Sequence, residues 1–200
     1  FDFTKVEDAL KHITNILEDK GVMVCYNGVV GYNNNRPIPV KECRGFALID
    51  DYAPFIFINN KDAKSAQMFT IIHELVHILI GHSAGFGDND GQIQESVLER
   101  FCDKVSATFL VPEILLKEEW RKVGENYTVL AKRFKVSRFV IARRAMDIGY
   151  ISEQHYYSLY RQWRNENTDT PTKQGGGGVF IPTAIKKTSR TFLIHINNAI

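Results

Sequence analysis

The chain has 200 residues, of which 44% are hydrophobic and 24% are charged, and its formal net charge is +2. A chain of this length buries one good core and little more, so we expect one main domain with an appended C-terminal segment. It has no apolar run near twenty residues long, which excludes a membrane-spanning helix and predicts no membrane partner. It opens Phe1-Asp2-Phe3-Thr4, without a signal-peptide pattern, and a cytoplasmic protein is expected. The absence of an initial Met suggests either an excerpt of a longer chain or a trimmed one.

The first third of the chain predicts one helix and three short strands. Apolar residues recur at helical spacing over residues 6–17, and Gly21 ends that helix. Strands are predicted over residues 22–26, 46–49 and 55–58, with a turn joining the last two. These segments predict an α+β start to the fold.

Two histidines and a glutamate follow in the next apolar segment, His73-Glu74-Leu75-Val76-His77. Positions i and i+4 lie on one helix face, so both imidazoles can reach one metal ion, such as Zn²⁺. Glu74 points about a hundred degrees away from His73, where it can take a proton from zinc-bound water and later protonate a leaving amine. The motif therefore predicts metal-assisted hydrolysis, for which a peptide bond is the best-suited substrate.

The residues around this motif are apolar nearly all round, which predicts a buried helix ending at Gly81. On an exposed helix, the same five residues could simply be solvated. A buried imidazole or carboxylate instead needs a hydrogen bond or a metal ion to offset its loss of water. The apolar surroundings thus favour the metal site.

A catalytic zinc site keeps three protein ligands and one open position. Glu99 is the candidate third ligand, on a helix predicted over residues 92–110 whose core-facing positions include Phe101. Asp103 lies one turn later on the same face, where it can accept a hydrogen bond from the far nitrogen of a zinc-bound histidine. Glu95 is a competing third ligand, and a solvated acidic stripe is the alternative without metal.

The motif at residues 73–77, together with the run from Glu99 to Pro112, resembles the ImmA/IrrE metallopeptidase family. In that family the third ligand opens a motif E-x-x-A-N-x-F-A-x-x-L-L-x-P, from which this chain departs at positions that include Cys102 and Asp103. The strands before the active-site helix also resemble the family, so the likeness covers residues 40 to 150. It implies a zincin-like α+β fold, with a small, mostly antiparallel sheet packed on the active-site helix and a helical C-terminal half.

The resemblance further implies a cytoplasmic, site-specific endopeptidase with one zinc ion per chain. Its expected substrate is a protein partner, a helix-turn-helix transcriptional repressor in a stress or mobile-element regulatory system. An edge strand beside the active-site helix, at Phe46 or at Phe55, would hold the substrate extended.

Two more residues are candidates near this site. His82 begins a glycine-rich loop and could donate a hydrogen bond to the oxyanion of the reaction, although an exposed helix terminus is its alternative. Cys102 follows Glu99 by three positions, so its thiolate could approach the open zinc position as a regulatory group, with simple packing as the alternative. The three cysteines show no C-x-x-C spacing, which favours reduced thiols.

The predicted domains are a peptidase domain over residues 1–150 and a helical extension over 151–200, with a flexible glycine-rich segment at 165–178. Residues 127–150 predict a helix-turn-helix-like pair, which closes the peptidase domain in the resembling family. We therefore expect this pair to pack on the peptidase domain.

The same pair allows a second function. Residues 117–164 carry a net charge of +6, and the second helix would offer Arg138, Arg143 and Arg144 to nucleic acid. The alternative function is a DNA-binding regulator or sensor that uses this basic region and has a structural or vestigial metal site. A further hypothesis is that single-stranded DNA or another nucleic acid activates the peptidase.

Overall fold

A computed structural model describes residues 3–31, 33–81, 92–166 and 186–199, without the side chains of residues 92–96 and 199. Two compact units make up the chain. The first is built from Phe1–Ser106 and Gly178–Ile200, and the second from Ala107–Gly177. The predicted division into a peptidase domain over residues 1–150 and an extension over 151–200 stays a prediction, as does the packing of residues 127–150 on the peptidase domain.

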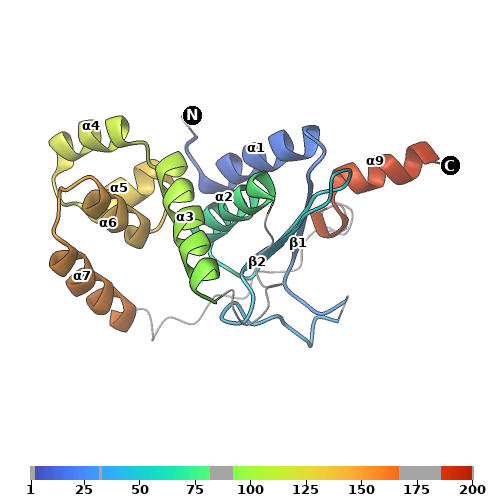
Figure 1. Cartoon of the computed structure of the whole chain (residues 1–200), viewed down its shortest axis with the longest axis horizontal. Helices are drawn as coiled ribbons and strands as arrows, with labels where there is room; N and C mark the ends of the chain where they lie inside the picture. The colour runs from blue at the N-terminus through green and yellow to red at the C-terminus, as the bar shows by residue number, and fades with distance from the viewer. Residues whose placement is uncertain (1–2, 32, 82–91, 167–185, 200) are drawn as a thin grey trace. The chain divides into compact units, whose positions relative to one another are not determined.

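The first unit contains a three-stranded sheet whose strand order is β1-β3-β2. Two of its strands, β1 and β2, are labelled in Figure 1. The chain reverses between β1 and β2 and again between β2 and β3, so β3 runs parallel to β1 and antiparallel to β2. The expected α+β fold with a small sheet is confirmed, although one of the two strand pairs is parallel where a mostly antiparallel sheet was predicted. The three strands are β1 (Met23–Asn27), β2 (Gly45–Leu48) and β3 (Phe55–Asn59).

Two helices, α1 (Val6–Asp19) and α2 (Lys64–Ile80), pack against each other and on this sheet. Alternate residues of β3 point to opposite faces, and Ile56 and Ile58 are completely buried in the core. As predicted, α2 is largely buried and ends at Gly81, whose φ of 70° is the left-handed conformation that glycine adopts at low cost.

The strand β2 lies close to α2 because Gly45 has no side chain. A Cβ atom at this position would lie 2.5 Å from Thr70 Cγ2 and 2.8 Å from the Phe57 carbonyl oxygen, closer than real contacts allow. Thr70 precedes Glu74 by one helical turn. Gly45 therefore lets this strand pass directly beside the helix that carries the motif.

One edge of β2 has its main-chain groups free of strand pairing. The Asn59 amide donates to the Arg44 carbonyl at 2.8 Å, and the antiparallel register then turns the amides and carbonyls of Gly45 and Ala47 away from β3. In the part of the chain that the structure describes, no strand pairs with β2 on that side.

The chain continues as α3 (Gln92–Leu110), which begins in the first unit and ends in the second. The second unit has an apolar core that includes Leu116, Leu130 and Ile141, confirming a helical C-terminal half. None of the described helices is both long and apolar enough to cross a membrane. The helices of the second unit are α4 (Glu113–Val123), α5 (Tyr127–Phe134), α6 (Arg138–Asp147) and α7 (Glu153–Glu166).

The last helix, α9 (Arg190–Ala199), belongs to the first unit and is anchored to the end of α1. The buried carboxylate of Glu18 accepts hydrogen bonds from the Ser189 hydroxyl at 2.7 Å and from the Arg190 amide at 2.9 Å. The Thr191 hydroxyl donates to the Glu18 carbonyl at 3.0 Å. Glu18 thus accepts hydrogen bonds from donors at the start of α9, as an N-cap residue does for the first amides of a helix, which have no partner within it.

Replacing Glu18 by Ala should lower the free energy of unfolding by about 1–3 kcal/mol, because the buried Ser189 hydroxyl and the Arg190 amide lose their acceptor. Urea unfolding of the wild-type and variant proteins measures this difference. Glu7→Ala, which removes an exposed carboxylate from the same helix, is the control and should cost less than about 1 kcal/mol. Equal stability of the two variants would contradict the anchoring role of Glu18.

Candidate metal centre

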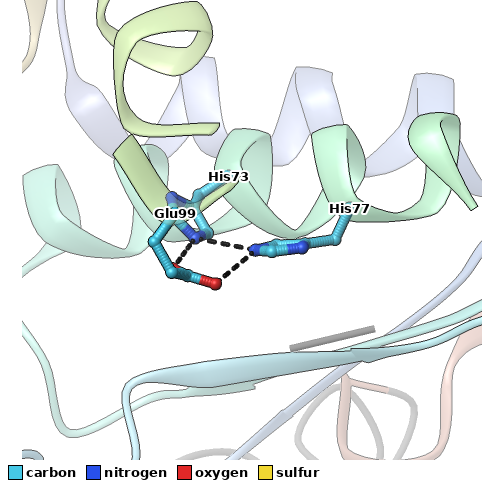
Figure 2. Close-up of side chains that lie close together, drawn as sticks. All are labelled: His73, His77 and Glu99. Carbon is cyan, nitrogen blue, oxygen red and sulfur yellow. Dashed lines mark hydrogen bonds and ion pairs between the residues drawn. The ribbon is translucent and has the colours of Figure 1, made fainter. Parts of the chain in front are cut away.

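His73, His77 and Glu99 converge from two helices on one point (Figure 2). The Nε2 atoms of the two histidines are 3.1 Å apart, because residues four positions apart on α2 share one face. Glu99 reaches them from α3, with Oε2 at 3.1 Å from His73 Nε2 and Oε1 at 3.1 Å from His77 Nε2. One ligand atom from each residue lies within 4.8 Å of the others, and no other described residues form such a set of three.

The chemistry of these donors fits a metal ion. Glu99 Oε1 is buried and has no hydrogen-bond partner among the described residues, despite its short distance to His77. A buried carboxylate oxygen without a partner is costly, and a cation at the point of convergence would satisfy it. Two imidazoles and one carboxylate are a ligand set of catalytic zinc sites, which leave the fourth position open.

Asp103 holds the other side of His73. Its Oδ1 atom lies 3.0 Å from His73 Nδ1, which leaves Nε2 of the same ring directed at Glu99 and His77. Burial lowers the pKa of His73, but the hydrogen bond to Asp103 and the charges of Asp103, Glu74 and Glu99 outweigh it, so the net pKa is raised. Since Nδ1–H donates to Asp103, the neutral tautomer keeps a lone pair on Nε2 for a metal.

Glu74 lies beside these ligands as a buried carboxyl group that does not belong to the set of three. Burial is the main cause that raises its pKa to about 7, with a smaller contribution from Glu99; His73 and the Ala47 amide act in the opposite direction. The Ala47 amide belongs to β2 and donates to this carboxylate, whereas Glu74 Oε2 has no partner among the described residues. A carboxyl group with a pKa near neutral can both accept and donate a proton.

The face of α3 that meets α2 differs from the one predicted. Phe101 was expected in the core but is 50% exposed, whereas Cys102, which was also expected there, is completely buried together with Ser106. Glu99, Cys102, Asp103 and Ser106 follow the i, i+3, i+4, i+7 spacing of one helix face, so directing Glu99 at the histidines buries Cys102.

Ala47 and Gly45 were not among the predicted site residues, although the structure places one at Glu74 and the other against the helix that carries it. Their contributions come from a main-chain amide and from the absence of a Cβ atom. Every residue except proline has a main-chain amide, so the role of Ala47 cannot be recognised from its residue type. For Gly45, the glycine itself is the only signal in the sequence.

Two predicted candidates lie outside the described part of the chain. His82 belongs to residues 82–91, and the side chain of Glu95 belongs to residues 92–96. Their proposed roles, as oxyanion donor and as competing ligand, stay predictions.

The three arginines predicted as nucleic-acid contacts are engaged inside the second unit. Arg138 stacks on the Trp163 ring at 4.9 Å from its centroid, and Arg143 pairs with Asp147 at 3.1 Å. Arg144 is only 4% exposed and donates to a main-chain carbonyl, that of Val111. This burial argues against Arg144 as a DNA contact, because the helical pair uses its second helix for packing.

Cys102 should be the least reactive of the three cysteines. Burial, with the nearby negative charges of Glu99, Asp103 and Glu74, raises the pKa of its thiol to about 11, so it carries no thiolate at neutral pH.

Cys25 and Cys43 are partly exposed. We expect iodoacetamide to modify Cys43 and Cys25 in the folded protein and Cys102 only after unfolding, as measured by peptide mass spectrometry. Rapid native labelling of Cys102 would restore it as a candidate regulatory thiol.

Comparison with known proteins agrees with this geometry. A curated relative, the radiation response metalloprotease IrrE of Deinococcus radiodurans, is 33% identical over 41% of this chain and 27% of the relative. This chain thus spans less than a third of that protein's length. A solved structure of a transcriptional regulator from Mycobacterium tuberculosis matches 72% of this chain and 42% of its own, with a TM-score of 0.51 and 15% identity, which shows a shared fold.

The model of the IrrE N-terminal-like domain family, Peptidase M78, matches residues 18–146, which include both helices of the candidate metal centre. Because this match covers more than half of the chain, the protein belongs to the IrrE N-terminal-like domain family of peptidases.

Proposed function

We propose that this chain is a zinc-dependent, site-specific endopeptidase that hydrolyses a peptide bond in a protein partner. The observation that carries the proposal is the convergence of His73, His77 and Glu99 beside the buried carboxyl group of Glu74. Membership of a peptidase family and the likeness to a metalloprotease support it.

His73, His77 and Glu99 would hold the zinc ion, and Asp103 would keep His73 in the tautomer that binds metal. Zinc, when bound, supplies a Lewis acid that lowers the pKa of coordinated water to about 7. The open fourth position expected of a catalytic site leaves room for that water and for the substrate carbonyl.

Glu74 would move the protons of the reaction. Its carboxylate takes a proton from the attacking water and then delivers it to the nitrogen of the leaving amine, so that the C–N bond breaks without releasing an amide anion. The Ala47 amide holds one side of this carboxylate, while among the described residues Glu74 Oε2 has no hydrogen-bond partner that would compete with water.

The substrate would bind extended along the free edge of β2. The sequence left open whether the strand at Phe46 or the strand at Phe55 served as this edge, and β3 is the central strand of the described sheet. The Gly45 amide and the Ala47 carbonyl point away from β3 and could pair with a substrate by β-augmentation, whereas the Ala47 amide is already bound to Glu74.

The partner that is cut would be a helix-turn-helix transcriptional repressor in a stress or mobile-element system. Two similarities support a regulatory role: one relative is a radiation response metalloprotease, and the fold is shared with a transcriptional regulator. The cytoplasmic location and activation by single-stranded DNA stay predictions. The internal contacts of Arg138, Arg143 and Arg144 give no support to the alternative of a DNA-binding sensor.

Metal analysis tests the ligand set. Purified protein loaded with zinc and then desalted should hold about one zinc per chain by atomic emission, and His77→Ala and Glu99→Ala should each lose it. Asp103→Ala should bind zinc about 10- to 100-fold more weakly, since it frees the His73 ring. His195→Ala removes an exposed histidine from α9 and is the control. Full zinc content in His77→Ala would exclude this site as the metal centre.

Glu74→Gln tests the assignment of the base. It should lower cleavage at least about a hundredfold, because the amide cannot accept the proton, and should leave zinc content unchanged. Wild-type and variant proteins are incubated with a lysate of the source cells, and new protein N-termini are identified by mass spectrometry. Cuts made by the wild-type protein should disappear in the variant and after chelation. Cuts that persist in Glu74→Gln would contradict the assignment.

A further inference from the structure

We propose that Phe46 selects the substrate, by packing against one large apolar side chain, aromatic by preference, of the segment bound along β2. This inference rests on the proposed function, since it concerns the substrate of the same site.

The main chain of β2 fixes where a bound segment would lie. Gly45 and Ala47 direct their amides and carbonyls away from β3, and the Ala47 amide reaches the carboxylate of Glu74. The free edge of β2 therefore runs past the group that is proposed to move the proton. A segment paired with this edge would place its own main chain next to the metal centre.

The side chains of β2 alternate between the two faces of the sheet. Ala47 is buried in the core, whereas Phe46 and Leu48 project from the other face and are 38% and 47% exposed. On that second face a bound segment would meet side chains of β2 that are apolar and still open to solvent.

Phe46 forms the outer member of a row of residues across the sheet. The strand register places Cys25 of β1 opposite Phe57 of β3, and Phe57 opposite Phe46 of β2. The Phe46 and Phe57 rings stack with centroids 5.0 Å apart and an interplanar angle of 15°. The stack holds the Phe46 ring from the side of β3, and the next position outward in this row belongs to a substrate residue.

A substrate residue opposite Phe46 would lie on the same face, in contact with its side chain. Directly opposed residues of paired strands have Cβ atoms about 4.5–5.5 Å apart, and aromatic pairs are among the most favourable of such neighbours. A phenylalanine at this substrate position would extend the Phe57–Phe46 stack, whereas an alanine would leave the Phe46 ring in water. Phe46 is thus a specificity-determining residue.

Peptide binding tests this inference separately from cleavage. The zinc-loaded Glu74→Gln protein is titrated into two pools of fluorescent decapeptides, with binding measured by anisotropy. Both pools have mixed polar residues at nine positions, and the fifth position is Phe in one pool and Ala in the other. The Phe pool should bind about five- to tenfold more tightly, as expected of one aromatic pair and its buried area.

Adding Phe46→Ala to this protein should bring the affinities for the two pools within about twofold of each other. Adding Phe46→Tyr should keep the difference in affinity. Tyr52→Ala, which removes a 95% exposed ring from the turn after β2, is the matched control and should also keep it. Equal binding of the two pools, including no binding of either, overturns the inference, as does a difference that survives Phe46→Ala. If the pools differ as expected but the wild-type protein cuts nothing in the lysate, the proposed function fails instead.

Discussion

His73 is held at both of its ring nitrogens by one helix, and the arrangement of the site depends on this double contact. Asp103 lies at Nδ1 and Glu99 at Nε2, with distances of 3.0 Å and 3.1 Å. Since the two acidic residues are one turn apart on α3, α3 can satisfy both nitrogens only in one position along α2. That position also brings Glu99 to His77, so the pairing that orients one imidazole assembles the whole ligand set.

The sheet supplies a main-chain hydrogen-bond donor for Glu74, which the two helices do not. Gly45 allows β2 to approach α2 beside Thr70, and this approach brings a main-chain amide to Glu74. A main-chain donor is fixed by the strand and does not change rotamer, so the carboxylate keeps its orientation without a dedicated side chain. The carboxyl group that is proposed to move the proton and the strand edge that would receive the substrate are thereby placed by the same contact.

Local spacing allowed much of this site to be predicted. His73 with His77, and Glu99 with Asp103, are i, i+4 pairs, which share a helix face whatever the tertiary structure. The burial of Arg144 and the exposure of Phe101 depend on which helix faces are covered, and apolar periodicity alone does not decide that. The insertion of β3 between β1 and β2 likewise depends on pairing across long loops, which strand propensity does not encode.

The contacts of Glu18 with Ser189 and Arg190 join residues more than 170 positions apart, on either side of the second unit. In the order of the chain, the second unit is therefore an insertion whose entry and exit both belong to the first. A peptide bond broken within Ala107–Gly177 would leave α9 attached to α1 through these hydrogen bonds rather than through the backbone. The fragment with the candidate metal centre and the C-terminal fragment would then form a noncovalent complex, so fragment complementation would be an inherent property of this topology.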